Sequence, residues 1–207
     1  MIDNLLPDEM ARMAERIGEK KAHMTAMRMF VLSVLAGSFI AFGAIFATTV
    51  TAGSTLPFGI TKLAGGVVFS LGLILVIVGG AELFTGNNLI VMAWASKKVS
   101  TRLLLRNWMI VYAGNLAGSM CMVAMILLSG YHLGGHGQTG VNMVSIAVQK
   151  CSHEPVQAFV LGILCNILVC LAVWLSFSAA TTTGKILSVI FPISAFVAAG
   201  FEHCVAN

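Results

Sequence analysis

The sequence predicts an all-α integral membrane protein built as an inverted repeat, with broken second and fifth spans. Three observations lead to this fold class. The 207 residues are 58% hydrophobic and only 10% charged, whereas soluble domains carry about 25% charged residues. Several separate apolar runs reach the roughly 20 residues that a helix needs to cross a bilayer. The same polar interruption follows two of these runs, after Gly79 and after Ala199.

The apolar runs alternate with polar or glycine-rich connections. They cover residues 29–50, 63–84, 89–95, 108–129, 156–179 and 186–200. The second and third runs count as one broken helix, so this chain contains five crossings. Residues 1–28 are expected to form a cytoplasmic amphipathic helix, because Met10, Met13 and Ile17 share one helical face. Residues 29–207 form the transmembrane channel domain.

Two basic clusters fix the expected orientation. They consist of Arg12, Arg16, Lys20, Lys21 and Arg28 before the first span, and of Lys97, Lys98, Arg102 and Arg106 after the second. Lysine and arginine collect in cytoplasmic segments, so both clusters are placed in the cytoplasm. The connections 53–62 and 130–155 then face outward. The N-terminus has no apolar core of the kind that a signal peptide needs.

The first break covers the sequence from Gly79 to Asn88, where small residues, a carboxylate and amides replace the apolar pattern. Glu82 precedes Asn87 by five positions, and Glu202 precedes Asn207 by the same spacing. Irregular backbone at membrane depth needs protein or a water-filled cavity to satisfy its polar groups. Broken helices that run in opposite directions are typical of inverted repeats with a midplane substrate site.

The second repeat lacks the pieces that follow the break in the first repeat. About 40–60 further residues are expected, the length of a half-helix and a sixth span. The sixth span is therefore expected to be missing from this chain, which suggests a fragment of a longer protein, with a shorter natural variant as the alternative.

Three titratable residues lie inside apolar runs, where ionisable groups are commonly functional. His203 can share a proton with a weak-acid anion near neutral pH; the alternative is a buried neutral histidine bonded to a carbonyl. Glu82 and Glu202 are interpreted as structural acceptors of backbone N–H groups freed by the breaks. Proton carriage is their alternative role, but a carboxylate on the path would repel an anion.

Other polar and apolar side chains complete the candidate pathway. Thr85 and Asn166 offer neutral donors, whereas Asn87 is expected to make interhelical hydrogen bonds. Lys150 either concentrates anions at a mouth or snorkels to the membrane surface. Five apolar residues are candidates for narrow constrictions that exclude hydrated ions, with ordinary packing as the alternative: Phe69, Leu73, Leu83, Phe84 and Phe196.

Four segments together resemble the formate/nitrite transporter family. They are GAELFTGNN (80–88), AGNLAGS (113–119), GILCNILVCLAVW (162–174) and GFEHCVAN (200–207). The resemblance implies an aquaporin-like protomer of six spans and a homopentamer in which each protomer has its own pore. It also implies that the first break carries Thr85 and the second the central His203, with Lys150 and Asn166 as polar vestibule residues. Leu73, Leu83 and Phe84 correspond to the inner constriction, Phe69 and Phe196 to the outer one.

The family mechanism implies attraction of the anion at the vestibule, proton sharing with the histidine and passage of a neutral acid through the apolar slits. Formate is the expected substrate, because the loop reads ELFTGNN; nitrite and hydrosulfide are the alternatives. The expected location is the inner membrane of a prokaryote. No cofactor or metal is expected, and the cysteines show no CxxC or zinc spacing.

Three other functions fit parts of the sequence. An aquaporin-type channel for neutral solutes would need Asn-Pro-Ala motifs and a pore arginine, which the sequence lacks. An intramembrane enzyme using His203 and Cys204 is disfavoured, because adjacent helical positions point about 100° apart. A non-transporting membrane subunit explains the spans but not the paired breaks. The basic residues form no aromatic-interleaved stripe, so no nucleic-acid role is expected.

Overall fold

Helices account for all regular secondary structure in the computed structural model, which describes residues 5–207. Residues 1–4 of the expected N-terminal segment lie outside the described part. Five helices are long and apolar enough to cross a membrane: α2 (Ala26–Thr51), α3 (Phe58–Gly79), α6 (Thr101–Leu128), α8 (Pro155–Ser178) and α9 (Thr182–Ala199). They match the predicted runs, and α3 and α9 end at the predicted breaks. The structure thus confirms an all-α membrane protein with broken second and fifth spans.

The remaining helices are short. They are α1 (Pro7–Ala22), α4 (Phe84–Asn87), α5 (Ile90–Ala95), the 3-10 helix η1 (Tyr131–Leu133) and α7 (Gln138–Cys151). The sequence did not predict α7, because its glycine-rich neighbours suggested one long connection over residues 130–155. Its valines at 141, 144 and 148 are each more than 60% exposed, so they follow a helical face that no core covers.

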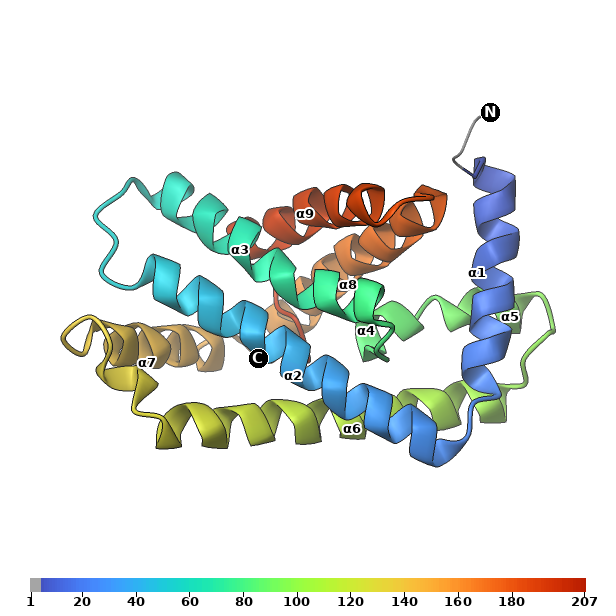
Figure 1. Ribbon diagram of the computed structural model, residues 1–207, viewed down its shortest axis with the longest axis horizontal. Helices are drawn as coiled ribbons and strands as arrows, with labels where there is room; N and C mark the ends of the chain where they lie inside the picture. The colour runs from blue at the N-terminus through green and yellow to red at the C-terminus, as the bar shows by residue number, and fades with distance from the viewer. Residues whose placement is uncertain (1–4) are drawn as a thin grey trace.

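Helix α1 lies at one end of the molecule and α7 at the other (Figure 1). The buried face of α1 consists of Met10, Ala14, Gly18 and Ala22. Ala14 and Gly18 directly follow the expected Met13 and Ile17, so the buried face is rotated by about one residue position from the expected one. It packs on α5, the half-helix after the first break. A Cβ atom at Gly18 would lie 3.1 Å from the Cβ of Ala93. The small residue therefore lets the two helices approach closely.

Helix α2 is central to the first repeat and packs against both α3 and α6. The GxxxG pair of Gly114 and Gly118 faces α2, and a Cβ at Gly118 would collide with the backbone of Val34. Such close contact between backbones is the usual role of small residues in membrane helices. Helix α6 begins at Thr101, earlier than predicted, because the Ser100 side chain accepts a bond from the Leu103 N–H at 3.3 Å.

The main apolar core surrounds the place where the two breaks meet. It includes Phe69, Leu73, Leu83, Val169 and Phe196, from α3, the first break, α8 and α9. The two breaks thus lie inside the protein and not against lipid, as irregular backbone requires.

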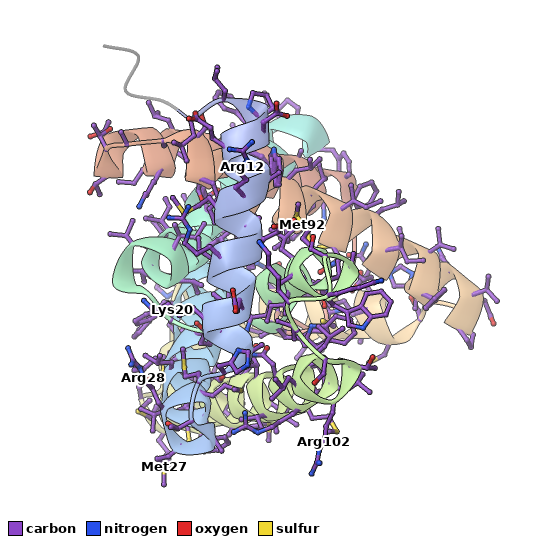
Figure 2. All side chains as sticks on the ribbon, turned by 90° about the vertical axis from the view of Figure 1, so that its right-hand side faces the viewer. Arg12, Lys20, Met27, Arg28, Met92 and Arg102 are labelled. Carbon is purple, nitrogen blue, oxygen red and sulfur yellow. The ribbon has the colours of Figure 1, made fainter. Side chains whose placement is uncertain are left out.

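The residues of the two basic clusters gather at the α1 end. Figure 2 looks onto that end, and Arg12, Lys20, Arg28 and Arg102 all lie on the face toward the viewer. The two basic clusters, although far apart in sequence, therefore share one side of the molecule.

Candidate functional site

The two breaks have the same backbone. Gly80 has φ 74° and ψ 31°, and Gly200 has φ 74° and ψ 29°. This left-handed conformation is costly for residues with a Cβ but not for glycine. In each break the amide after the glycine bonds back to the last helical turn at 3.0 Å. Local chemistry therefore ends both helices in the same way.

The carboxylate of Glu82 in the first break is held by side chains. The Lys21 Nζ lies 3.1 Å from both of its oxygens, and the Asn87 Nδ2 donates to it at 2.7 Å. Asn87 also donates to Asn107 of α6 at 3.0 Å and accepts from Lys21 at 2.8 Å. The expected backbone N–H donors are thus replaced by a lysine from α1 and an amide. Asn87 bonds to another helix as expected.

Asn115 of α6 satisfies the backbone of the first break. Its Oδ1 accepts from the Phe84 N–H at 2.9 Å, and its Nδ2 donates to the carbonyls of Glu82 and Ser33 at 2.9 and 2.8 Å. It is fully buried, so each of these bonds replaces water. The sequence interpretation assigned it no role, although an asparagine between Gly114 and Gly118 in an apolar span was the available indication.

The second break repeats this arrangement around Glu202. The Lys150 Nζ of α7 donates to Oε2 at 2.7 Å, and Asn207 donates to the same oxygen. His153 Nε2 lies 3.2 Å from Oε1. Lys21 and Lys150 therefore play equivalent parts in the two repeats. Lys21 was interpreted only as part of a topology cluster, although its place before the first span matches that of Lys150 before the fourth.

His203 lies in the second break and bonds to Thr85 of the first. The Nε2 of His203 and the Oγ1 of Thr85 are 3.1 Å apart, and the two residues are 3% and 1% exposed. Nδ1 accepts from the amides of Val205 and Ala206 at 3.3 and 3.1 Å. Since an acceptor carries no proton, these amides assign the hydrogen to Nε2. The ring is therefore a neutral donor directed at Thr85.

Asn166 of α8 shares a cavity of about 790 Å³ with Thr85 and His203. Its Nδ2 donates to the Cys170 sulfur at 3.6 Å. Its Oδ1 has no hydrogen-bond partner among residues 5–207. The structure thus brings together three of the four predicted pathway residues. The fourth, Lys150, bonds to Glu202, the residue before His203, and lines a neighbouring cavity that His203 also lines.

Two further cavities lie at the ends of the candidate pathway. The α1-side cavity, of about 580 Å³, is lined by Leu73, Leu83, Lys21 and Glu82. The α7-side cavity, of about 350 Å³, is lined by Phe69, Phe196, Lys150, Glu202 and His203. Each cavity thus combines a lysine–glutamate pair with bulky apolar side chains.

Four of the five predicted constriction residues divide between these cavities, and Phe84 lines the cavity of Thr85 and His203. Leu73 and Leu83 face the α1 side, and Phe69 packs on Phe196 at 5.8 Å between ring centres on the α7 side. Phe196 also stacks on His203 at 5.7 Å. Phe84 packs edge-on against Trp108 and Tyr112 of α6, and it also packs against the main apolar core that contains Leu73 and Leu83.

Glu15 of α1 bonds to the turn between α5 and α6. Its carboxylate accepts from Lys98 and Ser96. The hydrogen bond from Lys98 is the main reason why the pKa of Glu15 is below its usual value, and Ser96 adds to it. This contact connects the middle of α1 to the turn between α5 and α6.

These features define a multi-pass membrane protein of the inverted-repeat type, whose broken helices meet at a polar centre. The family of formate/nitrite transporters matches residues 8–207. The chain belongs to this family.

Several relatives share most of its length. The formate channel FocA of Escherichia coli K12 is 45% identical over 206 residues, which cover 99% of this chain and 72% of FocA. FocA of Haemophilus influenzae is 44% identical over 204 residues and is also covered to 72%. A solved pentameric formate channel with formate bound has a TM-score of 0.84 and 49% identity, covering 88% of this chain and 72% of that one.

Proposed function

We propose that this protein carries small monovalent anions of weak acids, formate first among them, across the inner membrane of a prokaryote. The bond between buried His203 and Thr85 carries this proposal, because it places a proton-bearing ring where the two breaks meet. Lysine-bearing cavities on both sides supply approaches to it. Similarity to channels described as formate channels supports the choice of formate.

The lysines attract the anion at each mouth. Lys21 and Lys150 are each paired with a glutamate, so the net charge of each pair is near zero, and the ammonium group in each cavity draws an anion only weakly and does not hold it tightly. Further inward, Leu73 and Leu83 or Phe69 and Phe196 exclude water. An ion in such a slit loses hydration worth several kcal/mol, which favours neutralisation of the anion before it passes.

His203 meets the anion as a neutral donor. The anion replaces Thr85 as the acceptor of the Nε2 proton, and Asn166 offers a further amide. Transfer of that proton to the anion requires a second proton on Nδ1, which displaces the two backbone amides that bond to it. Hydrogen bonding therefore comes first, and proton sharing follows when the ring is protonated from solution. The other polar residues at the breaks, Glu82, Asn87, Glu202 and Asn207, bond to one another and to the two lysines, which connects the first break to α1 and the second to α7.

The proposal includes topology and assembly. The basic α1 end faces the cytoplasm, residues 29–207 form the channel domain, and five copies assemble with one pore each, as the solved pentameric relative suggests. The protein is not proposed to be an enzyme. Both ring nitrogens of His203 have partners among the described residues, and Cys204 is not one of them.

The test is flux of formate, nitrite and hydrosulfide into proteoliposomes that contain the full-length protein, from about pH 5 to about pH 8, across histidine's ordinary titration range. Saturable flux of formate above nitrite and hydrosulfide supports the proposal. Preference for nitrite or hydrosulfide would keep the mechanism and change the substrate. Absence of all three fluxes would favour a non-transporting membrane subunit.

A further inference from the structure

His153 distinguishes the cluster around Glu202 in the second break from the cluster around Glu82 in the first. Both breaks hold a lysine, a glutamate and an asparagine in the same arrangement. Only Glu202 also bonds to a histidine, through His153 Nε2 at 3.2 Å. No histidine is among the described residues that line the α1-side cavity. His23 at the end of α1 is exposed and bonds to the Glu19 carbonyl, not to Glu82.

The contact between His153 and Glu202 permits two charge states. An ionised carboxylate only accepts hydrogen bonds, so Nε2 must carry a hydrogen and Nδ1 takes the second proton. The side chains of His153 and Glu202 are 15% and 10% exposed, and that of Lys150 is 30% exposed. With neutral His153 the lysine and the glutamate cancel. With protonated His153 the cluster carries one net positive charge.

The surroundings leave this added charge in place. Lys62 of α3, Lys150 of α7 and His203 line the cavity that Glu202 faces. Glu154 follows His153, but it is exposed at the start of α8 and makes no ion pair in the described chain. The thiol of Cys151 is also exposed. Glu202 is therefore the acidic group that His153 contacts, and it is already shared with Lys150.

We propose that His153 sets the charge of the α7-side mouth, so that the channel recruits anions more strongly when the solution on that side is acidic. This inference rests on the proposed anion passage. His153 is a positioning residue: it does not line the cavity, but its proton relieves Lys150 of part of its pairing with Glu202. The α1-side mouth, where Lys21 and Glu82 keep their charges, lacks this response.

The first experiment measures the half-saturation concentration for formate with the pH changed on one side of the vesicle at a time. The solution on the α7 side is acidified from about pH 7.5 to about pH 5.5, across histidine's ordinary range. At low salt, this should lower the half-saturation concentration of the wild type about threefold relative to that of H153Q. Glutamine keeps an N–H donor for Glu202 but cannot be charged. H153K, with a fixed charge, has the low value at both pH values.

Two matched controls accompany H153Q. H132Q removes a histidine near the same end of the molecule that makes no bond to Glu202, and H23Q removes one from the α1 end. Both should keep the wild-type response to pH on the α7 side. About 1 M salt, with a Debye length of about 3 Å, should weaken the response. An equal response in wild type and H153Q would overturn the inference.

The second experiment reads the charge without transport. Cys151 is exposed and two residues from His153, and its labelling by an anionic and a cationic methanethiosulfonate reagent is followed by peptide mass spectrometry. The ratio of the two rates cancels the ionisation of the thiol. The rate with the anionic reagent divided by the rate with the cationic reagent should rise about threefold on acidification in wild type and stay constant in H153Q. A constant ratio in wild type would overturn the inference even if formate flux were absent and the proposed function failed.

Discussion

The two breaks share a framework but differ at the residues that meet in the centre. Each has a glycine with φ 74°, and each holds a glutamate between a lysine and an asparagine. Three positions after the glycine, the first break has Leu83 and the second has His203. The repeat therefore supplies the glycine turn and the lysine–glutamate–asparagine cluster twice, whereas the central histidine occurs once.

The support itself also differs between the repeats. Asn107 and Asn115 of α6 bond to the first break and are fully buried. The second break instead has His153 beside Glu202. The first break is thus held by fixed amides and the second by a group that can change charge. Duplicated backbone geometry tolerates this divergence, because the glycine turn does not depend on the residues that follow it.

Replacement of His203 should have the largest effect. H203A removes both the donor and the proton, and formate flux should fall about a hundredfold, within the range typical of a positioned acid or base. H203N keeps an N–H donor, so it should retain more flux than H203A but lose histidine's part of the pH dependence. Proteoliposome flux from about pH 5 to about pH 8 checks both expectations. Flux like that of wild type at every pH in H203A would contradict the role of the ring, and H132A is the control.

The two lysines should differ in their effect on stability. K21M leaves the carboxylate of Glu82, with 5% of its side chain exposed, without its cation. Removing one partner of a buried pair costs about 3–5 kcal/mol. K150M should cost less, because Glu202 keeps His153 as a partner. Thermal unfolding of the purified proteins measures the difference. The double variant K21M/E82Q should recover much of the loss; equal losses in K21M and K150M would contradict the comparison.

The glycines should behave alike. A Cβ at Gly80 or Gly200 would meet no atom within 4 Å, so G80A and G200A add backbone strain without a clash. A residue with a Cβ loses about 1–2 kcal/mol in the left-handed region. Both variants should lower the unfolding temperature by similar amounts. Gly59, within α3 and equally free of neighbours, is the control, and G59A should not destabilise. A large difference between G80A and G200A would show that one break has additional support.

The sequence was sufficient to predict the spans and both breaks, because a carboxylate next to glycine in an apolar run is costly unless the helix ends there. The equal spacing from Glu82 to Asn87 and from Glu202 to Asn207 indicated the repeat, although it was not interpreted as a bond between each glutamate and its asparagine. Such local patterns depend on few residues, so they can be recognised without tertiary structure.

Other features depended on tertiary packing or on local backbone conformation. Lys21 reaches Glu82 only because the small residues of α1 let it lie on α5, and a lysine before a span looks like a topology marker. Phe84 follows extended Leu83, so the two side chains point to opposite sides and only Leu83 faces the α1-side cavity. Helix α7 was hidden by the glycines before it. The position of Lys21 thus depended on a neighbour distant in sequence, whereas the direction of Phe84 and the helical form of α7 depended on local backbone that the hydropathy pattern does not show.

Glu15 should give the smallest effect, and it tests whether the α1 end is insensitive to pH near neutrality. The Lys98 hydrogen bond lowers the pKa of Glu15 in the folded state, so the contact stabilises α1 at and above the usual carboxylate range. It is lost only as the pH falls through the lowered pKa. Hydrogen exchange of α1 amides, corrected for intrinsic rates, should therefore be constant between about pH 5 and about pH 8. E15Q should loosen α1 slightly at all of these pH values, and protection of α1 in the wild type that changed near neutral pH would contradict this expectation.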